Sequence, residues 1–444
     1  MVRGTTGREE PMEPTEGAQT PVAAREEGPG RGVGRRSVAK SAALTAALLL
    51  AGRGVAQARP ARRPDAKPAA GGDLTVRLPA PTGPHRIGST TLHLVDRSRR
   101  DPWQPEIPVR ELMVTILYPA RAAGDAPPAP QMTRDAAARF PLIDAVMHPE
   151  LPGTGVNWAA TLTHARTGAP AQTVRRPVLL YTPGGGDPRT LGTGLAEELA
   201  GHGCVVVTID HPGDASEVDF PEAATGRDTV RETVFRGDPR RDPRQFRTAV
   251  DTRVADVRYV LDQLELTAAG RNPDASGRPL PAGLGRALDL RRIGVYGHSA
   301  GGTTAAQALY EDHRLRAAVN LEGYLDHPPE RPGSEGELFP VARYGVDRPM
   351  LMLQTDGFPH RAELERSWAA VLAHSHGRTR RGQFGATAHG VFTDYAAFAP
   401  QLQAAGLMTA EERIKLVGAS GPDRSIPLVR RAVRSFFARQ LSAP

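Results

Sequence analysis

The sequence predicts an α/β fold: a mostly parallel central sheet with helices on both faces and an antiparallel strand pair at its N-terminal end. Residues 177–182 and 204–209 are unbroken apolar runs, typical of strands buried on both faces of a parallel sheet. Residues 190–202 between them are compatible with a helix, so the spacing indicates a βαβ unit. Residues 248–266 carry valine and leucine at alternating steps of four and three, which predicts a long helix packed on that sheet.

The first 58 residues have the features of an export signal. An apolar stretch at residues 41–52 follows the basic pair Arg35 and Arg36 and is too short to span a bilayer. Residues 56–58 read Ala-Gln-Ala, an A-x-A cleavage site. We therefore expect a signal peptide cleaved after Ala58 and a secreted chain. The arginine pair resembles a twin-arginine signal, but such pairs recur along the sequence and do not fix the export route.

Residues 59–72 are rich in proline, alanine, arginine and glycine, and this composition predicts a disordered linker. We place one folded domain at residues 73–444. It opens with two runs of β-branched and apolar residues at 87–96 and 110–118, which predict the antiparallel strand pair.

The other expected elements follow the alternating pattern. Further strands are predicted at residues 292–296, 316–321, 349–354 and, more weakly, within 380–388, and further helices at residues 134–147, 302–310, 391–398 and 426–441. Residues 119–130 are expected to form a loop, and residues 153–166 a surface segment with no defined element.

Two polar insertions interrupt this pattern, at residues 211–247 and 267–289. Loops of this length in a compact domain are usually functional or mobile. The first insertion leaves the carboxyl end of a central strand, where ligands bind in open α/β sheets, so we expect it to cover the site.

Composition narrows the classes of partner. The formal net charge is +7, and the basic residues are mostly arginines scattered among acids, which indicates solvated surface rather than a nucleic-acid interface. Transient contact with a membrane surface is compatible with this charge. Cys204 is the single cysteine of the sequence, which excludes an intramolecular disulfide and a cysteine-based metal site. The composition does not indicate an oligomeric state.

A candidate nucleophile lies at the centre of the alternating region. Residues 297–301 read Gly-His-Ser-Ala-Gly, between the predicted strand at 292–296 and the predicted helix at 302–310. A G-x-S-x-G turn between a strand and a helix holds the serine hydroxyl above the sheet. We therefore identify Ser299 as the candidate nucleophile of acyl transfer and expect the Ala300 amide to face the developing oxyanion.

A serine nucleophile needs a base, and the base needs a carboxylate to orient it. Around such a turn the partners follow in the order serine, acid, histidine. His389 follows the last strand candidate and leads into the helix-like run at 391–398, so it is the candidate base. His374 and His376 lie on or at the end of a helix and are expected to face away from the sheet edge.

Two residues are candidates for the acid. Glu322 follows the strand at 316–321, and Asp356 follows the strand at 349–354. Both carboxylates would stand at the carboxyl ends of parallel strands, so position alone permits either to hold the imidazole.

The loop after the first central strand reads Pro-Gly-Gly-Gly at residues 183–186. Its lack of side chains lets an amide approach a substrate, so Gly185 and Ala300 are the candidate oxyanion-hole donors. The loop lacks the nucleotide-binding fingerprints, and we expect no cofactor. His211 beside Asp210 has no second ligand set at metal spacing, and we expect no metal.

Several short motifs occur together in this sequence between Leu74 and the C-terminus. They are Asp96-Arg97-Ser98, Arg110-Glu111-Leu112, Tyr118-Pro119, Tyr181-Thr182-Pro183-Gly184-Gly185-Gly186, Arg189-Thr190, Leu199-Ala200-Gly201-His202-Gly203, Ile209-Asp210-His211, Phe220-Pro221, Arg253-Val254-Ala255-Asp256, Gly297-His298-Ser299-Ala300-Gly301-Gly302 and His389-Gly390-Val391-Phe392-Thr393-Asp394-Tyr395. As a set they resemble the α/β-hydrolase family of platelet-activating factor acetylhydrolases, plasma and isoform II type, and the related exported bacterial lipases and esterases.

This resemblance implies metal-independent hydrolysis of carboxylic esters through an acyl-enzyme, with a small-molecule or lipid ester as substrate. It favours Glu322 over Asp356, because the family carries its acid after the strand that follows the nucleophile helix. The chain departs from the family pattern at two positions: relatives usually have aspartate where Glu322 stands, and many have histidine where Pro183 stands. The alternative functions are a polyester or longer-chain lipid hydrolase and a catalytically silent binding protein of the same fold.

Overall fold

The computed structural model describes residues 73–442 except 122–124, 223–227 and 332. The expected export signal at 1–58 and the expected linker at 59–72 lie outside the described residues.

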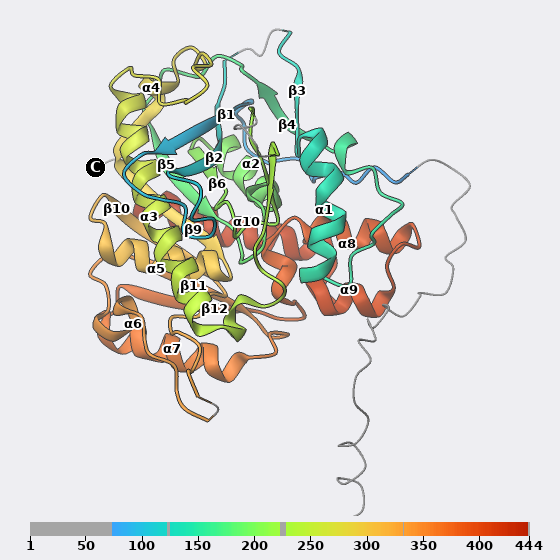
Figure 1. Cartoon of the computed structure of the whole chain (residues 1–444), viewed down its shortest axis with the longest axis vertical. Coiled ribbons are helices and arrows are strands. Elements are labelled where there is room, and N and C mark those ends of the chain that lie inside the picture. Colours follow the sequence, from blue (N-terminus) through green and yellow to red (C-terminus); the bar gives the residue numbers. More distant parts are fainter. Residues whose placement is uncertain (1–72, 122–124, 223–227, 332, 443–444) are drawn as a thin grey trace, which may run out of the picture. The chain divides into compact units, whose positions relative to one another are not determined.

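A ten-stranded sheet forms the centre of the domain, in the order β12-β11-β10-β9-β5-β6-β2-β1-β4-β3 (Figure 1). Its parallel part consists of β6 (Val205–Ile209), β5 (Arg176–Thr182), β9 (Leu288–His298), β10 (Leu315–Leu321), β11 (Met350–Thr355) and β12 (Thr379–Phe384). At the other side β1 (Ile87–Asp96) and β2 (Arg110–Pro119) pair antiparallel, and β2 pairs antiparallel with β6. The predicted α/β fold, with its mostly parallel sheet and its N-terminal antiparallel pair, is confirmed.

Helices cover both faces of the sheet. One face packs against α3 (Pro243–Ala268), α5 (Ala300–Glu311), α6 (Pro340–Tyr344) and α7 (Arg361–His374), and the other against α2 (Thr193–Gly201) and α10 (Pro422–Gln440). Along β5, Val178 and Leu180 belong to the first core, while Leu179 and Tyr181 belong to the second. Successive side chains of a strand point to opposite faces, so a strand covered on both sides is apolar throughout.

A third apolar cluster lies under α1 (Arg134–Met147), α8 (Tyr395–Ala404) and α9 (Ala410–Val417). Trp158 is its centre, with ring centroids 4.9 Å from Phe140 and 5.7 Å from Phe398. The short elements are β3 (Pro128–Pro130), β4 (Leu162–Thr167), β7 (Glu217–Asp219), β8 (Val230–Glu232), α4 (Leu284–Ala287) and the 3-10 helices η1 (Trp158–Ala160), η2 (Arg189–Gly192), η3 (Pro239–Arg241) and η4 (His389–Phe392). Among the described helices, none combines the length and the apolar composition needed to cross a bilayer.

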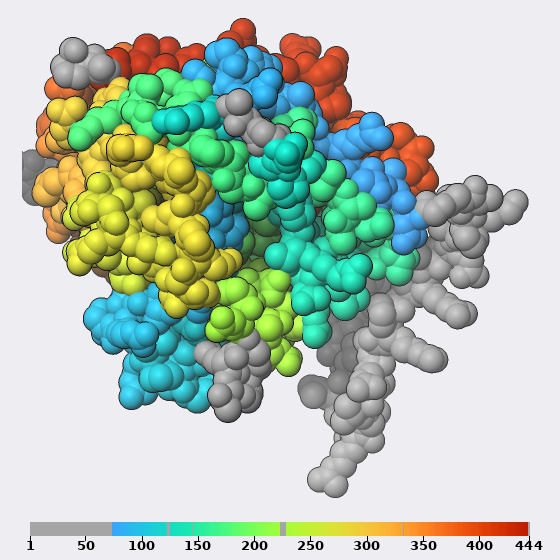
Figure 2. Space-filling model, turned by 90° about the horizontal axis from the view of Figure 1, so that it is seen from above, coloured from blue at the N-terminus to red at the C-terminus, as the bar shows by residue number. Residues whose placement is uncertain are grey.

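Three sequence expectations about local structure were wrong. The segment expected to lack a defined element contains β4, which pairs with β1 and β3, and the expected loop at 119–130 ends in β3. Most side chains of β4 are exposed, so no apolar pattern marked it. The first insertion is shorter than expected, because α3 begins at Pro243, capped by the Asp242 side chain. The second insertion, which contains the yellow segment in Figure 2, lies along β1, where the Ala275 amide donates to the His93 carbonyl at 2.8 Å.

Candidate active site

Ser299 is the single residue between β9, which ends at His298, and α5, which begins at Ala300. Its φ is 54° and its ψ is −124°, a backbone conformation that costs energy for any residue with a Cβ atom. The Ser299 amide donates to the Leu321 carbonyl at 2.8 Å, and the Ser299 carbonyl accepts from the Gly302 amide at 2.8 Å. These backbone bonds hold the strained turn at the carboxyl edge of the sheet, with the serine partly exposed.

The glycines on either side of Ser299 are required by close packing. A Cβ atom on Gly297 would lie 2.2 Å from the Gly301 carbonyl oxygen, and one on Gly301 would lie 2.0 Å from the Thr182 carbonyl oxygen. No side chain fits at those distances. The turn therefore packs backbone against backbone on the end of β5, which is the local reason for the G-x-S-x-G pattern.

His389 and Glu322 form a hydrogen-bonded pair at the same edge. His389 Nδ1 lies 2.7 Å from Glu322 Oε2, and the Glu322 side chain is fully buried while that of His389 is 30% exposed. The other carboxylate oxygen, Oε1, accepts from the Thr355 hydroxyl at 2.8 Å and from the Thr355 amide. Glu322 itself has a φ of 62°, so the chain turns sharply as it leaves β10.

Asp356, the alternative acid, contacts a different part of the site. Its exposed carboxylate accepts from the Ala386 amide at 2.8 Å and from the Thr387 amide at 3.0 Å. These backbone hydrogen bonds hold the pKa of Asp356 below its usual value. Asp356 therefore fastens the loop before His389, whereas Glu322 contacts the imidazole itself.

His298 connects the serine turn to the histidine loop. Its Nε2 donates to the His389 carbonyl at 3.1 Å, and the two imidazole rings lie 4.3 Å apart. The Phe358 ring also contacts His389, with 5.0 Å between the two ring centroids. The hydrogen bonds found among the described residues do not include one between Ser299 Oγ and His389 Nε2.

The glycine loop lies beside the serine turn. A Cβ atom on Gly185 would be 3.5 Å from the Ala300 Cβ and 3.1 Å from Pro239 Cγ. The structure thus brings together the two candidate oxyanion donors, and it places Pro239 of η3, in the first insertion, against Gly185. Gly185 remains partly exposed beside it.

Three residues next to the glycine loop could hold a cation: ligand atoms of Asp144, His148 and Asp187 all lie within 4.8 Å of one another. Burial would lower the pKa of His148, but Asp144 and Asp187 raise it to about 9. Burial, together with the charge of Asp187, raises the pKa of Asp144 to about 7 although His148 lowers it. His148 Nε2 lies 3.2 Å from Asp187 Oδ1, and the raised pKa of His148 favours the protonated imidazole beside this carboxylate.

His211 and Asp210 are both buried and bind different partners. His211 Nδ1 lies 3.0 Å from Asp256 Oδ2 and His211 Nε2 lies 2.8 Å from the Thr182 hydroxyl, while Asp210 pairs with Arg189. Burial lowers the pKa of His211, so the ring is neutral, with Nδ1–H donating to the carboxylate.

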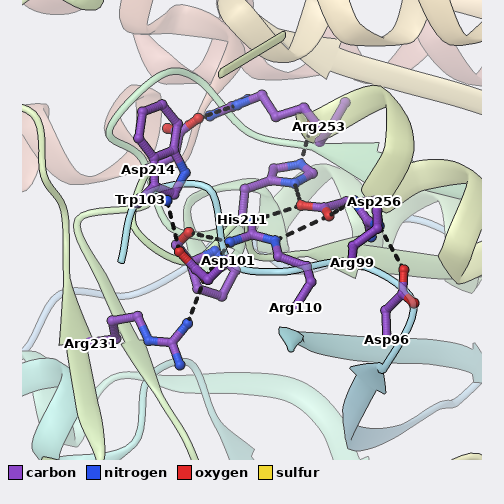
Figure 3. A network of polar contacts seen from close by, with 12 residues as sticks. Asp96, Arg99, Asp101, Trp103, Arg110, His211, Asp214, Arg231, Arg253 and Asp256 are labelled. Carbon is purple, nitrogen blue, oxygen red and sulfur yellow. Dashed lines mark hydrogen bonds and ion pairs between the residues drawn. The ribbon is translucent and has the colours of Figure 1, made fainter. Parts of the chain in front are cut away.

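Sequence reasoning missed the role of Arg253 and Asp214, which belong to the buried polar network of Figure 3. Arg253 contacts the backbone of the glycine loop and pairs with Asp214. A signal was present, since Arg253 interrupts the apolar face of the predicted helix next to Val250 and Val257, where a buried arginine needs partners.

A cleft of about 750 Å³ opens beside His389. Apolar and aromatic side chains contribute much of its wall, and they are Met147, Pro149, Phe358, Pro359, Tyr395, Ile414 and Leu416. His298 and His148 also line it, so the cleft reaches from the histidine loop to the cluster of Asp144, His148 and Asp187. An apolar cleft with a few polar groups is the usual form of a small-molecule site.

Known proteins with related sequences are esterases. A probable 1-alkyl-2-acetylglycerophosphocholine esterase from Arthroderma benhamiae is 26% identical over 385 residues, covering 81% of this chain and 87% of that protein. A platelet-activating factor acetylhydrolase from Canis lupus familiaris is 29% identical over 182 residues, covering 39% of this chain and 38% of that protein.

Structural comparison gives the same class. A ferulic acid esterase from Streptomyces cinnamoneus superimposes with a TM-score of 0.62 at 31% sequence identity, covering 83% of this chain and 96% of that one. The family model for platelet-activating factor acetylhydrolase, isoform II, matches residues 156–441. That range contains the serine turn, the acid candidates and the histidine loop. The chain therefore belongs to the platelet-activating factor acetylhydrolase, isoform II, family of esterase-type hydrolases.

Proposed function

We propose that this chain is a serine carboxylic-ester hydrolase that acts through an acyl-enzyme. His389 takes the proton of the Ser299 hydroxyl as the oxygen attacks the ester carbonyl, and Glu322 holds the imidazole in the required tautomer. His389 then returns the proton to the leaving alcohol, and a water molecule activated by the same imidazole releases the acyl group. The Gly185 and Ala300 amides stabilise the oxyanion in both steps.

The observation that carries the proposal is the pairing of a strained serine with a buried acid–imidazole pair. Ser299 has a positive φ of 54° at the carboxyl edge of the sheet, and its amide bonds the Leu321 carbonyl. The next residue, Glu322, places its Oε2 2.7 Å from His389 Nδ1. Folding alone requires neither the strain nor the buried carboxylate, and each costs stability. A function that uses both groups accounts for that cost.

Labelling with a fluorophosphonate probe tests the nucleophile directly. We expect stoichiometric labelling of the wild-type chain at Ser299, identified by peptide mass spectrometry, and no labelling of Ser299→Ala. The matched control is Ser367→Ala, because Ser367 is a buried serine of α7 that bonds the Leu325 amide. Folded wild-type protein that stays unlabelled at Ser299 would refute the serine mechanism and favour a catalytically silent binding protein.

For the substrate, we propose esters with an apolar acyl or aryl part. The supporting features are the apolar wall of the cleft beside His389 and the Phe358 ring that stacks near its imidazole. The named relatives include esterases for an acetylated glycerophospholipid and for ferulic acid. Rates on p-nitrophenyl esters from acetate to palmitate, on methyl ferulate and on a polyester film separate these classes. A rate that rises with chain length and on the film would instead favour a lipase or polyester hydrolase, the alternative function.

We also propose transient contact with ester aggregates or membrane surfaces. Leu142 and Val146 on α1 are 64% and 59% exposed, and Ile414 on α9, which lines the cleft, is 45% exposed. Exposed apolar side chains near a cleft mark interaction surfaces. Replacing Leu142 and Val146 by serine should weaken vesicle co-sedimentation without changing hydrolysis of a soluble ester, and equal sedimentation of both proteins would contradict this contact.

Export is proposed on the N-terminal sequence alone. Fractionation of the native host should place a chain beginning after Ala58 outside the cell. Uncleaved protein confined to the cytosol would contradict the proposal.

A further inference from the structure

The glycine loop at residues 183–186 is a turn in which the Asp187 amide donates to the Gly184 carbonyl at 3.2 Å. Gly185 is partly exposed, and its amide makes no hydrogen bond to another described residue. An oxyanion donor must be fixed before the reaction, because its value lies in being already aimed at the developing charge. Groups outside the loop add to this turn bond in fixing the orientation of the Gly185 amide.

Arg253 on α3 provides two such contacts. Its Nη1 donates to the Pro183 carbonyl at 2.5 Å, and its Nη2 donates to the Gly184 carbonyl at 2.7 Å. The Gly184 carbonyl belongs to the peptide unit whose N–H is that of Gly185. Because a peptide unit is planar, fixing the carbonyl of Gly184 also fixes the direction of the Gly185 N–H.

Asp214 completes the arrangement from the loop after β6. Its two oxygens accept from Arg253 Nε at 2.5 Å and from Nη2 at 2.7 Å, and Oδ1 also accepts from the Gly186 amide at 3.1 Å. Gly185 thus lies between one peptide unit held by Arg253 and another held by Asp214. The Arg253 and Asp214 side chains are at most 2% exposed, so these charge-assisted bonds are shielded from water.

The same face of α3 also supports the neighbouring loop. Asp256, one turn after Arg253, binds His211, and His211 binds the hydroxyl of Thr182 immediately before the glycine loop. Figure 3 shows Arg253 with Asp214 on one side of this network and Asp256 with Arg110 on the other. Arg110 contacts Asp256, Asp101 and the Pro212 carbonyl, but no residue of the glycine loop.

We propose that Arg253 and Asp214 are positioning residues that clamp the oxyanion loop and aim the Gly185 amide at the substrate. This inference rests on the proposed function, in which Gly185 donates to the oxyanion. Among the side chains that the structure describes, Arg253 alone donates to two successive loop carbonyls, which a planar guanidinium can do and a lysine ammonium cannot do in the same geometry. Arg253→Lys keeps the positive charge and removes the pair of guanidinium N–H groups that bind the two carbonyls.

The kinetic test compares Arg253→Lys with a matched control at the other edge of the sheet. Arg348 also spans two backbone carbonyls, those of Asp312 and Leu315, and its side chain is 13% exposed. Loss of an aimed oxyanion donor lowers kcat rather than raising KM, because the ground-state ester does not carry the charge. We expect kcat on p-nitrophenyl acetate to fall about tenfold to hundredfold in Arg253→Lys, with KM within about threefold. Arg348→Lys should keep kcat within about twofold.

Asp214→Asn tests the second half of the clamp. It keeps an oxygen for the Gly186 amide and removes the charge that pairs with Arg253, so kcat should again fall with KM nearly unchanged. Thermal unfolding of all three variants identifies losses that come from unfolding. Equal kcat in Arg253→Lys and Arg348→Lys, measured per folded molecule, would overturn the proposal.

Amide hydrogen exchange provides a readout that needs no activity. In Arg253→Lys, a peptide spanning residues 183–187 should exchange faster than in the wild type, while the same peptide in Arg348→Lys should not. Unchanged exchange in Arg253→Lys would overturn the clamp even if the ester is hydrolysed. If the wild type neither reacts with a fluorophosphonate nor hydrolyses esters, the proposed function fails, and hydrogen exchange still decides whether the clamp orders this loop.

Discussion

Glu322 and Asp356 follow adjacent parallel strands, β10 and β11, and their carboxylates have different partners. Glu322 is fully buried and binds the imidazole of His389 and the hydroxyl and amide of Thr355, whereas Asp356 is exposed and binds the backbone amides of the loop before His389. Both stand at the edge where ligands bind in this class of fold. The difference lies in how the chain leaves each strand, since Glu322 turns inward with a φ of 62°. Position at a strand end is therefore common to both candidates and does not by itself identify the acid.

The largest effect is expected from Glu322→Gln. The amide keeps the shape of the carboxylate but loses the charge that stabilises the imidazolium and fixes its tautomer. We expect kcat on p-nitrophenyl acetate to fall by about 10³ to 10⁴, with a circular dichroism spectrum like that of the wild type. A kcat within tenfold of the wild type would remove Glu322 from the acid role.

Glu322→Asp sharpens the comparison, because the resemblance leads us to expect aspartate at this position. The shorter side chain has to reach His389 Nδ1 from a backbone that is fixed by the sheet. We expect kcat to fall about tenfold to hundredfold, since displacement of a catalytic group by about 1 Å costs about a hundredfold. Activity as low as that of Glu322→Gln would mean that the loop does not adjust at all.

Asp356→Asn should change stability more than rate. One amide acceptor is kept and the charge is lost, so the free energy of unfolding should fall by about 0.5–1.5 kcal/mol, as for one hydrogen bond. We expect kcat to stay within about threefold of the wild type. Loss of most activity in a folded protein would reverse the assignment of the two carboxylates.

The smallest effect is expected from replacing His148, which pairs with a further buried carboxylate, Asp187. The change should appear in how the free energy of unfolding depends on pH. The pKa of His148 is raised to about 9, so its contribution to stability is full below about 6.5 and is lost as the pH rises through about 9. In denaturant unfolding between pH 7 and pH 9, His148→Gln should therefore lose less stability than the wild type. Parallel curves for the two proteins would show that His148 binds no extra proton on folding.

The parallel core was predictable because its strands are covered on both faces and are mostly apolar, as the β5 residues Val178 to Tyr181 are. Two helix starts could have been found from local signals. Asp242 before Pro243 is a capping residue before a first-turn proline, and Thr409 with Glu412 forms the capping box of α9. β4 carries no such signal, because it lies next to the edge strand β3 and most of its side chains face solvent.

The site was less predictable than the fold. Ser299 and His389 each follow a recognisable strand, so their types and positions were sufficient to nominate them. The choice of acid depends on where Thr355 of the next strand presents its hydroxyl and amide, which no local pattern reports. The contact of Arg253 with Asp214 joins residues 39 positions apart, and without an alignment only the buried charge on an apolar helix face indicated it.

The contacts that form the site join residues far apart in the sequence, and this affects how fast the site can fold. The imidazole and its carboxylate are 67 residues apart, and the Arg253 contact to Pro183 spans 70. Closing such long segments is slow compared with forming a helix or a single βαβ unit. The last-formed contacts in refolding should therefore be those of the active site, and recovery of ester hydrolysis should lag behind recovery of helical circular dichroism. For this molecule, enzymatic activity would report completion of the whole sheet rather than of any one segment.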